Sequence, residues 1–224
     1  MLFSVNDLFG FLAQAEDFKA SIVDAFIDRK TMKIKHLAID TGGMLSNHTV
    51  VVAADKIGKI DPDDRSVTLQ LNKADLENLE VIEKVGLDDG LQLSDIPSLL
   101  LGPSSKDVAA TFLEKNAPDG RLFSARSVSG SVACHGADKL GKVIGLLAGS
   151  ADLTVSHLAV DTGVVLPETQ RVLPINLVET VGDADTKTVL TIDAATLDAS
   201  PQLENTTALD RHWADKVATY YGVF

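Results

Sequence analysis

The sequence predicts a mainly β protein that consists of two small antiparallel β-barrels in tandem, with a few short helices. The first observation behind this prediction is an internal repeat. His36–Gly42 (HLAIDTG) returns as His157–Gly163 (HLAVDTG), which sets an offset of 157 − 36 = 121 residues. Aliphatic positions coincide at the same offset on both sides of the motif. A period this long indicates two copies of one domain, because solenoid repeats are roughly 20 to 50 residues long.

The second observation is that each copy consists of short β-branched and aliphatic runs separated by turn residues, which is typical of antiparallel strands. The expected strands of the first copy are Phe9–Gln14, Ala20–Asp28, Lys33–Asp40, Thr49–Ala53 and Val67–Asn72. Those of the second copy are Ser129–Cys134, Lys142–Ala148, Val155–Asp161, Arg171–Ile175 and Thr188–Asp193, with turns at Gly141 and Gly182. Since a sheet of this size avoids exposed edges best by closing on itself, each copy is expected to form a barrel.

Two helices are expected outside the strands. Ser104 and Ser105 precede an amphipathic run that ends at Pro118–Gly120, which predicts a capped helix between the copies. Near the C-terminus an apolar residue recurs at every fourth position, which predicts a helix that packs across a barrel mouth. The stripe consists of Leu209, Trp213, Val217 and Tyr221, and a packing role is expected for Trp213. The expected organisation is therefore a first barrel at 1–102, a helical linker at 103–121 and a second barrel at 122–224.

Within the repeated strand, alternation predicts one buried face and one outer face. The buried face is expected to hold Leu37 and Ile39, and the other face His36, Ala38 and Asp40.

Composition narrows the classes of partner and compartment. The net charge of −12 argues against nucleic acid and anionic membrane surfaces, because phosphate binding needs clustered Lys and Arg. Cys134 is the single cysteine, so it forms no disulfide within the chain and is compatible with a reducing cytosol. Phe11–Ala15 aligns with Val132–Gly136 at the 121 offset, so the N-terminal segment is interpreted as a strand of the first domain and not as a signal peptide. No uninterrupted apolar run reaches 18 residues, so no membrane insertion is expected and the predicted location is the cytoplasm.

Two motifs suggest chemistry. Asp-Thr-Gly occurs once in each copy, and Asp40 with Asp161 could form the paired carboxylates of an aspartic hydrolase, in which a shared proton separates the two pKa values. Gly43 and Val164 follow the two motifs, where such proteases carry Ser, Thr or Ala. Asp and Gly are also ordinary turn residues at the end of a strand. We therefore keep the hydrolase only as a remote alternative.

A metal site is the other possibility. His36 and His157 could bind a metal together with Asp40 and Asp161, because residues an even number of positions apart lie on one face of a strand. The sequence has no third and fourth ligand at tight spacing. The prediction is therefore no catalytic residue, no metal, no cofactor and no enzymatic activity.

Several segments of the second half resemble a known family. These segments are Leu122–Val143, His157–Gly163, Arg171–Pro174, Ser200–Leu203, Leu209–Arg211 and Tyr220–Gly222. They are similar to PRC-barrel domains, and the last three resemble the tail of stand-alone bacterial proteins with two such domains. The family includes the cytoplasmic domain of the photosynthetic reaction-centre H subunit and the C-terminal domain of the ribosome-maturation factor RimM.

The resemblance implies a non-enzymatic protein-binding or adaptor module. The implied partner is another protein, and a second copy of the chain is one candidate. An alternative implied by the H subunit is a peripheral component of a photosynthetic or electron-transfer complex. This alternative rests on similarity of fold alone.

Overall fold

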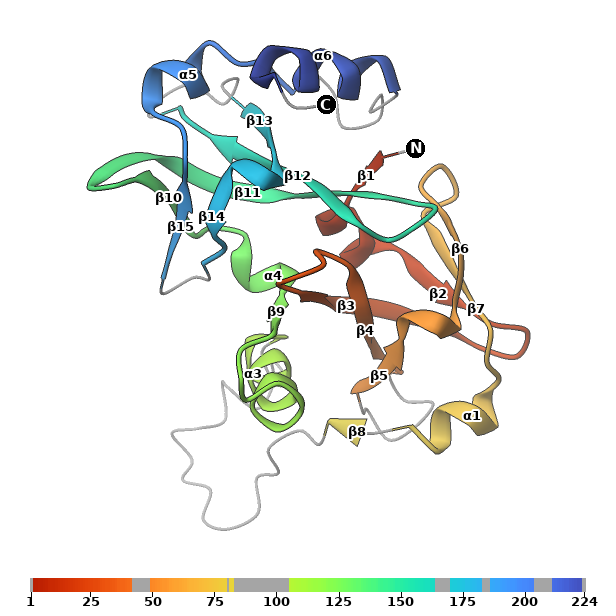
Figure 1. The fold of residues 1–224 in the computed structure, drawn as a ribbon. Helices are drawn as coiled ribbons and strands as arrows, with labels where there is room; N and C mark the ends of the chain where they lie inside the picture. Colours follow the sequence, from red (N-terminus) through yellow and green to blue (C-terminus); the bar gives the residue numbers. More distant parts are fainter. Residues whose placement is uncertain are drawn as a thin grey trace, which may run out of the picture.

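The computed structural model describes residues 2–41, 49–79, 81–82, 105–163, 170–182, 186–203 and 211–222, without the side chains of 81–82, 105–108 and 211–212. Two sheets dominate these residues (Figure 1), which confirms the prediction of a mainly β protein. Gly43, Ser104, Val164 and Leu209 lie outside the described part, so the stripe of the C-terminal helix can be followed only from Trp213 onwards.

The first sheet contains eight strands, and most of them come from the first copy. Its order is β6-β7-β2-β3-β4-β5-β8, and β9 also pairs with β3. The strands are β2 (Leu12–Gln14), β3 (Lys19–Asp28), β4 (Ile34–Asp40), β5 (Thr49–Ala53), β6 (Ile57–Asp61), β7 (Ser66–Leu69), β8 (Val81–Ile82) and β9 (Leu122–Ser124).

The second sheet contains seven strands, and most of them come from the second copy. Its order is β13-β12-β11-β10-β15-β14, and β1 also pairs with β11. The strands are β1 (Leu2–Ser4), β10 (Val132–His135), β11 (Asp138–Gly149), β12 (Val155–Asp161), β13 (Gln170–Pro174), β14 (Val178–Thr180) and β15 (Lys187–Leu190).

The sheets differ from the prediction in direction and closure. Each one is mixed, because β2 pairs in parallel with β7 and β10 pairs in parallel with β15. In the first copy β7, the second strand of the β6–β7 hairpin, lies beside β2 and runs in the same direction. In the second copy β15, which follows β14, lies beside β10 in the same way. Among the described residues the pairings form open paths, so the predicted antiparallel barrels are not confirmed.

The helices are short apart from two. They are η1 (Val5–Gly10), η3 (Ala54–Lys56), α1 (Lys73–Glu77), α3 (Ser105–Asn116), α4 (Ala125–Val128), η5 (Ile175–Leu177), α5 (Ala194–Asp198) and α6 (Arg211–Tyr221). α3 confirms the helix predicted between the copies. Side-chain caps fix the starts of α1 and α5, where the amides of Asp75 and Thr196 donate to Asn72 and Asp193.

The first strand of each copy lies in the sheet of the other copy. In β1, Phe3 is the antiparallel partner of Ala148 on β11, and in β9, Phe123 is the partner of Ile27 on β3. Both exchanged strands have the sequence Leu-Phe-Ser. The N-terminal segment is therefore not one strand of the first domain as predicted, because it forms β1 in the second sheet, η1, and only then β2 in the first sheet.

The offset between the copies is 120 residues in this region. Leu12 pairs with Ser66, and Val132 pairs with Lys187, so the two strands match at 132 − 12 = 120 while their partners match at 187 − 66 = 121. A bulge between Ala133 and Cys134 in the β10–β11 pairing takes up the extra residue. The alignment of Phe11–Ala15 with Val132–Gly136 is therefore wrong by one residue.

Most predicted strands are present, and β5 and β12 have the predicted bounds. The turn predicted at Gly141 is wrong, because Gly141 lies inside β11. A Cβ atom at this position would lie 2.2 Å from the Asp161 carbonyl oxygen, so glycine permits the close approach of the two strands. Gly182 follows β14 and ends the described part there.

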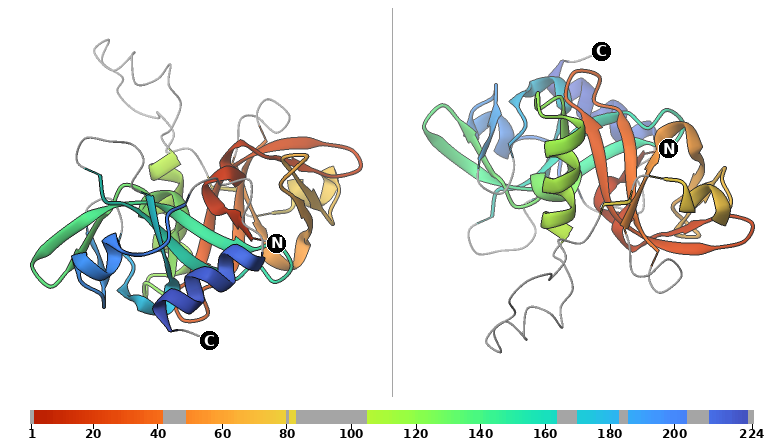
Figure 2. Two further views of the ribbon diagram at one scale, coloured as in Figure 1. Left: turned by 90° about the horizontal axis from the view of Figure 1, so that it is seen from above. Right: turned by 90° about the horizontal axis from the view of Figure 1, so that it is seen from below.

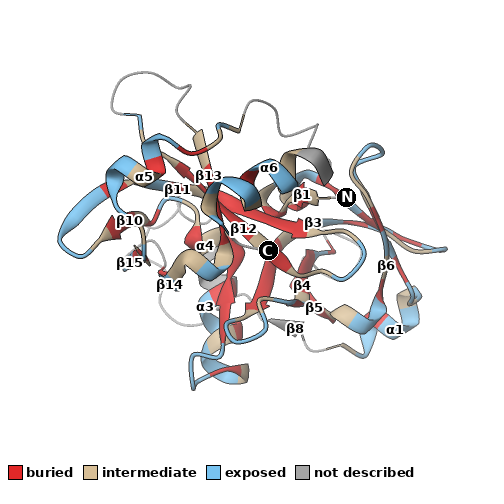
Figure 3. Cartoon of the chain, turned by 45° about the horizontal axis from the view of Figure 1, so that its top comes forward, coloured by how far each residue is buried: buried red, intermediate tan, exposed pale blue. Residues whose placement is uncertain are grey.

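Leu37 and Ile39 share one buried face of β4 as predicted, but the opposite face is not an outer one, because Ala38 is also fully buried. Leu37 and Ile39 belong to the main core, which contains residues of both copies, and the buried interior appears as the red strands of Figure 3. The opposite face of the first sheet carries Ala38 and packs on Phe112 of α3. The equivalent face of the second sheet packs on Trp213 of α6. The C-terminal helix therefore covers a sheet face and not a barrel mouth (Figure 2).

Candidate functional site

Two equivalent hairpins meet where the copies join. The β3–β4 turn and the β11–β12 turn each contain a non-glycine residue with left-handed backbone, Met32 (φ 52°) and Leu153 (φ 57°). The Ile34 amide donates to the Leu153 carbonyl (2.9 Å), and the Val155 amide donates to the Met32 carbonyl (2.7 Å). The two bonds are related by the 121 offset, as expected for copies arranged around an approximate two-fold axis.

A depression of about 330 Å³ lies beside this contact and is lined by both copies. The first copy contributes Lys33, Lys35, Asp55 and Gly58, and the second copy contributes Ser150 and Asp152. We call the depression together with the exposed Lys30, Lys33 and Lys35 the hairpin surface.

The two hairpins have the same backbone conformation but differ in charge. Lys30, Lys33 and Lys35 are exposed in the first copy, and the residues at +121 are Ala151, Thr154 and Ser156. Because the second hairpin adopts the same turn without these lysines, the fold does not require them.

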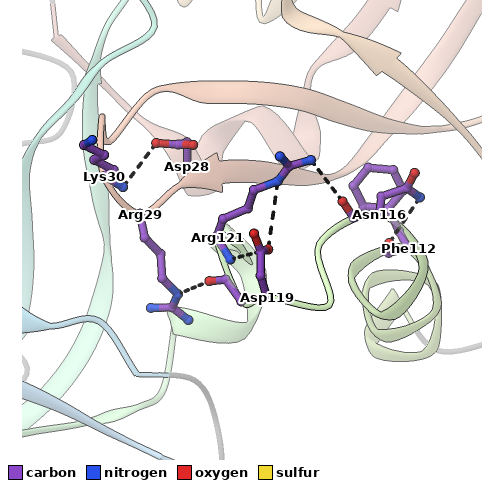
Figure 4. A network of polar contacts seen from close by, with 8 residues as sticks. Asp28, Arg29, Lys30, Phe112, Asn116, Asp119 and Arg121 are labelled. Atoms are coloured by element: carbon purple, nitrogen blue, oxygen red, sulfur yellow. Dashed lines mark hydrogen bonds and ion pairs between the residues drawn. The ribbon is translucent and has the colours of Figure 1, made fainter.

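The first hairpin is held firmly in place. Asp28 Oδ1 accepts bonds from the amides of Lys30 and Thr31 and from the Thr31 hydroxyl, and these bonds lower the pKa of Asp28. Arg29 donates through Nε to the Gly120 carbonyl (2.9 Å) and through Nη1 to the Val181 carbonyl (2.7 Å). Figure 4 shows the hairpin beside the linker, where Arg121 bonds to the Asn116 carbonyl. These hydrogen bonds fix the backbone of the hairpin that carries Lys30, Lys33 and Lys35.

A buried carboxylate joins the copies near the hairpin. Asp24 on β3 is fully buried, and its Oδ2 accepts from the Ser124 hydroxyl (2.6 Å). Its Oδ1 accepts from the amides of Ala25 (2.7 Å) and Arg126 (3.2 Å). Burial raises the pKa of Asp24, although the donated hydrogen bonds and the Arg126 charge act in the opposite direction.

The contacts around Asp24 have counterparts on the other side of the axis. Arg126 donates to the Val23 carbonyl (2.8 Å) and lies over the Phe9 ring (4.5 Å). Asn6 correspondingly donates to the Ile144 carbonyl (2.8 Å) and to the Ser129 hydroxyl (2.8 Å). The position equivalent to Asp24 is Gly145, where a Cβ atom would approach Asn6 Nδ2 to 3.1 Å. The copies are therefore locked together by polar contacts of different chemistry at matching places.

The structure does not bring together the carboxylates of the hydrolase hypothesis. Asp40 pairs with Ser21 and Thr49 in the first sheet, and Asp161 lies in the second sheet. The hairpins meet in antiparallel orientation at Lys33 and Thr154. At about 3.3 Å per residue, β4 and β12 carry the two carboxylates some 20 Å away from this contact in opposite directions. Asp161 Oδ1 instead accepts from the Gly163 amide (2.9 Å), which is a turn contact.

The two histidines of the repeat pack against helices. The His36 ring lies edge-on to Phe112 of α3 (5.4 Å), and the His157 ring lies against Trp213 of α6 (5.8 Å). Burial lowers the pKa of His157 to about 4. Within the described ranges, no group of three or more His, Cys, Asp and Glu side chains is placed to hold a metal. Cys134 is buried, and its thiol faces the Thr188 carbonyl (3.7 Å).

Sequence reasoning missed the hairpin surface, the buried Asp24 and the strand exchange. Comparing the copies position by position could have found the hairpin surface, because the three lysines align with neutral residues at the 121 offset. The repeated Leu-Phe-Ser could have located the exchanged strands, although not the sheet in which each lies. The burial of Asp24 has no sequence signal.

No helix in the described ranges is long and apolar enough to cross a membrane.

Comparison with known proteins adds no family. No protein-family model matches the chain, and a search of curated proteins finds no match to it. The PRC-barrel resemblance therefore stays a prediction from the sequence.

Proposed function

We propose that the protein is a non-enzymatic adaptor with two domains of the PRC-barrel type, and that it binds a partner protein at the hairpin surface. The observation that carries this proposal is the unequal charge of the two hairpins. The second hairpin forms the same turn without lysines, so the three exposed lysines of the first hairpin are not needed for folding. We therefore assign them to binding.

The chemistry of the hairpin surface indicates an acidic segment of the partner. Asp28 and Asp152 accept hydrogen bonds from their own turns, and the charges of Lys35 and Lys33 also help to lower the pKa of Asp28 and Asp152, respectively. The ammonium groups of Lys30, Lys33 and Lys35 suit carboxylates of a partner, and contacts of this kind raise association rates and respond to salt. The three lysines outnumber Asp55 and Asp152 at the hairpin surface, so this surface is locally basic on a chain of net charge −12, which favours one orientation of an acidic partner.

Replacing the three lysines by the residues of the second copy tests the proposal. The variant K30A/K33T/K35S uses side chains that the same backbone already accepts at 151, 154 and 156. We expect it to bind a partner isolated from native lysate at least tenfold more weakly than the wild type, measured with the purified partner by calorimetry. Loss of binding should be accompanied by loss of its salt dependence.

A second triple variant serves as the control for net charge. K19S/K139A/K187T removes three other exposed lysines and should bind as the wild type does within twofold. Equal binding by both triple variants would contradict the assignment of the hairpin surface. If the captured partner is a subunit of a photosynthetic or electron-transfer complex, the result would favour the alternative role.

A further inference from the structure

α6 covers an apolar face of the second sheet. Trp213 packs on the cluster formed by Leu147, Ala159 and Val172, and Val217 is fully buried. The view from above in Figure 2 shows α6 lying across this sheet. Tyr220 adds a polar contact, because its hydroxyl donates to the Thr196 carbonyl (2.8 Å).

His157 lies under this helix. The residue is 8 % exposed, its ring centroid is 5.8 Å from that of Trp213, and its Nδ1 is 2.8 Å from the Ser156 hydroxyl. Its neighbours across the two adjacent strands are Leu147 and Pro174, which are apolar.

Among the described side chains, no charged group near His157 is placed to neutralise an imidazolium; α6 also carries Arg211 and His212, whose side chains lie outside the described part. On β12 the next ionisable residue is Asp161, which bonds to the Gly163 amide, and on β13 Arg171 donates to the Ser200 carbonyl. The charged side chains described on α6, Asp215 and Lys216, are exposed. Burial is the cause of the lowered pKa of His157. Proton uptake at this site would therefore place a charge in an apolar contact.

The first copy provides an internal comparison. His36 meets Phe112 of α3 in the same way, but α3 runs on into β9, which is paired with β3 and held by the Arg29 bond to Gly120. α6 has no such strand after it within the described residues. Of the two covering helices, α6 is therefore the one that can leave its sheet without breaking a sheet.

We propose that α6 is a pH-sensitive cover, which lies on the second sheet while His157 is neutral and leaves it when His157 takes up a proton. Its release uncovers Leu147, Ala159 and Val172. The sign follows from the two states: the docked state disfavours the proton, so docking is complete above the ordinary pKa of 6.5. It weakens as the pH falls from 6.5 towards 4.

Trp213 is the only tryptophan, so its fluorescence reports on α6 directly. The full chain is titrated from pH 7.5 to pH 4 while tryptophan emission, acrylamide quenching and far-ultraviolet circular dichroism are recorded. We expect a red shift of the emission and at least a threefold rise in the quenching constant between pH 6.5 and pH 4. The β signal in the circular dichroism should stay constant over this range.

Variants decide whether His157 is responsible. H157F and, in case that variant does not fold, H157Q should show neither change, whereas H36F should behave like the wild type. A transition that persists in both His157 variants would overturn the proposal. So would a wild type whose emission dims without any gain in acrylamide access, because His157 would then be protonated under a docked helix. Loss of the β signal together with the red shift would show global unfolding and would also overturn it.

Discussion

Replacing Asp24 by alanine is expected to lower the free energy of unfolding by about 3 kcal/mol or more, because three donors at a buried site lose their acceptor and each unsatisfied buried group costs about 1 to 3 kcal/mol. The Ser124 hydroxyl and the amides of Ala25 and Arg126 would all lose their acceptor in a site that water does not reach. The effect is measured by urea unfolding at pH 7. Ala25 belongs to the first copy and Ser124 and Arg126 to the second, so the contact between the two copies should weaken.

Asp24→Asn is the matched control, and we expect it to change the free energy of unfolding by about 1 kcal/mol or less, within the usual net value of one hydrogen bond. Its amide oxygen can still accept from the two backbone amides, and its amino group can donate to Ser124 Oγ. The pH dependence should also differ. Because burial raises the pKa of Asp24 in the folded state, its contribution is greatest at low pH and declines as the pH rises above 3.8. The asparagine variant should lack this decline, and an equally large loss in both variants would contradict the role of the carboxylate.

Phe3→Ala and Phe123→Ala are each expected to cost about 3 to 5 kcal/mol, the usual value for removing a buried phenylalanine. Phe3 and Phe123 are 2 % and 3 % exposed and belong to the main core. Because each lies in the sheet of the other copy, each substitution should destabilise the whole molecule. Urea unfolding is followed by Trp213 fluorescence, which reports on the second sheet, and by circular dichroism, which reports on both sheets.

The more informative of the two substitutions is Phe123→Ala. This side chain lies on β9 in the first sheet, yet the account expects the Trp213 transition to move to lower urea together with the circular dichroism. Leu12→Ala provides the control, since Leu12 is 43 % exposed on β2 and should cost much less. A Trp213 transition unchanged in Phe123→Ala would show that the copies unfold independently.

The sequence predicts the local elements well where the hydrophobic pattern alone determines them. β4 and β12 follow from alternation, because Leu37 and Ile39 need a core. The burial of Ala38 beneath α3 does not follow from it. α3 follows from the apolar spacing of its residues. These features depend on neighbouring residues, so a single sequence contains them.

The remaining features depend on contacts between distant residues. Nothing in Leu-Phe-Ser states whether β1 joins its own sheet or the other one, since the same three residues suit both edges. Gly141 resembles a turn residue, but it serves a close approach to Asp161 that only the folded register reveals. The paired Asp-Thr-Gly motif suggested a dyad because the sequence cannot show that β4 and β12 diverge from their contact.

The most direct test of the exchanged arrangement is the set of nuclear Overhauser effects of β1 and β9 in the full-length chain. The account predicts contacts between the backbone protons of Phe3 and Ala148 and between those of Phe123 and Ile27, unchanged on dilution. Contacts of Phe3 with Ile27 and of Phe123 with Ala148 would instead place each strand in its own copy. That result would contradict the interlocked junction on which the hairpin surface is built.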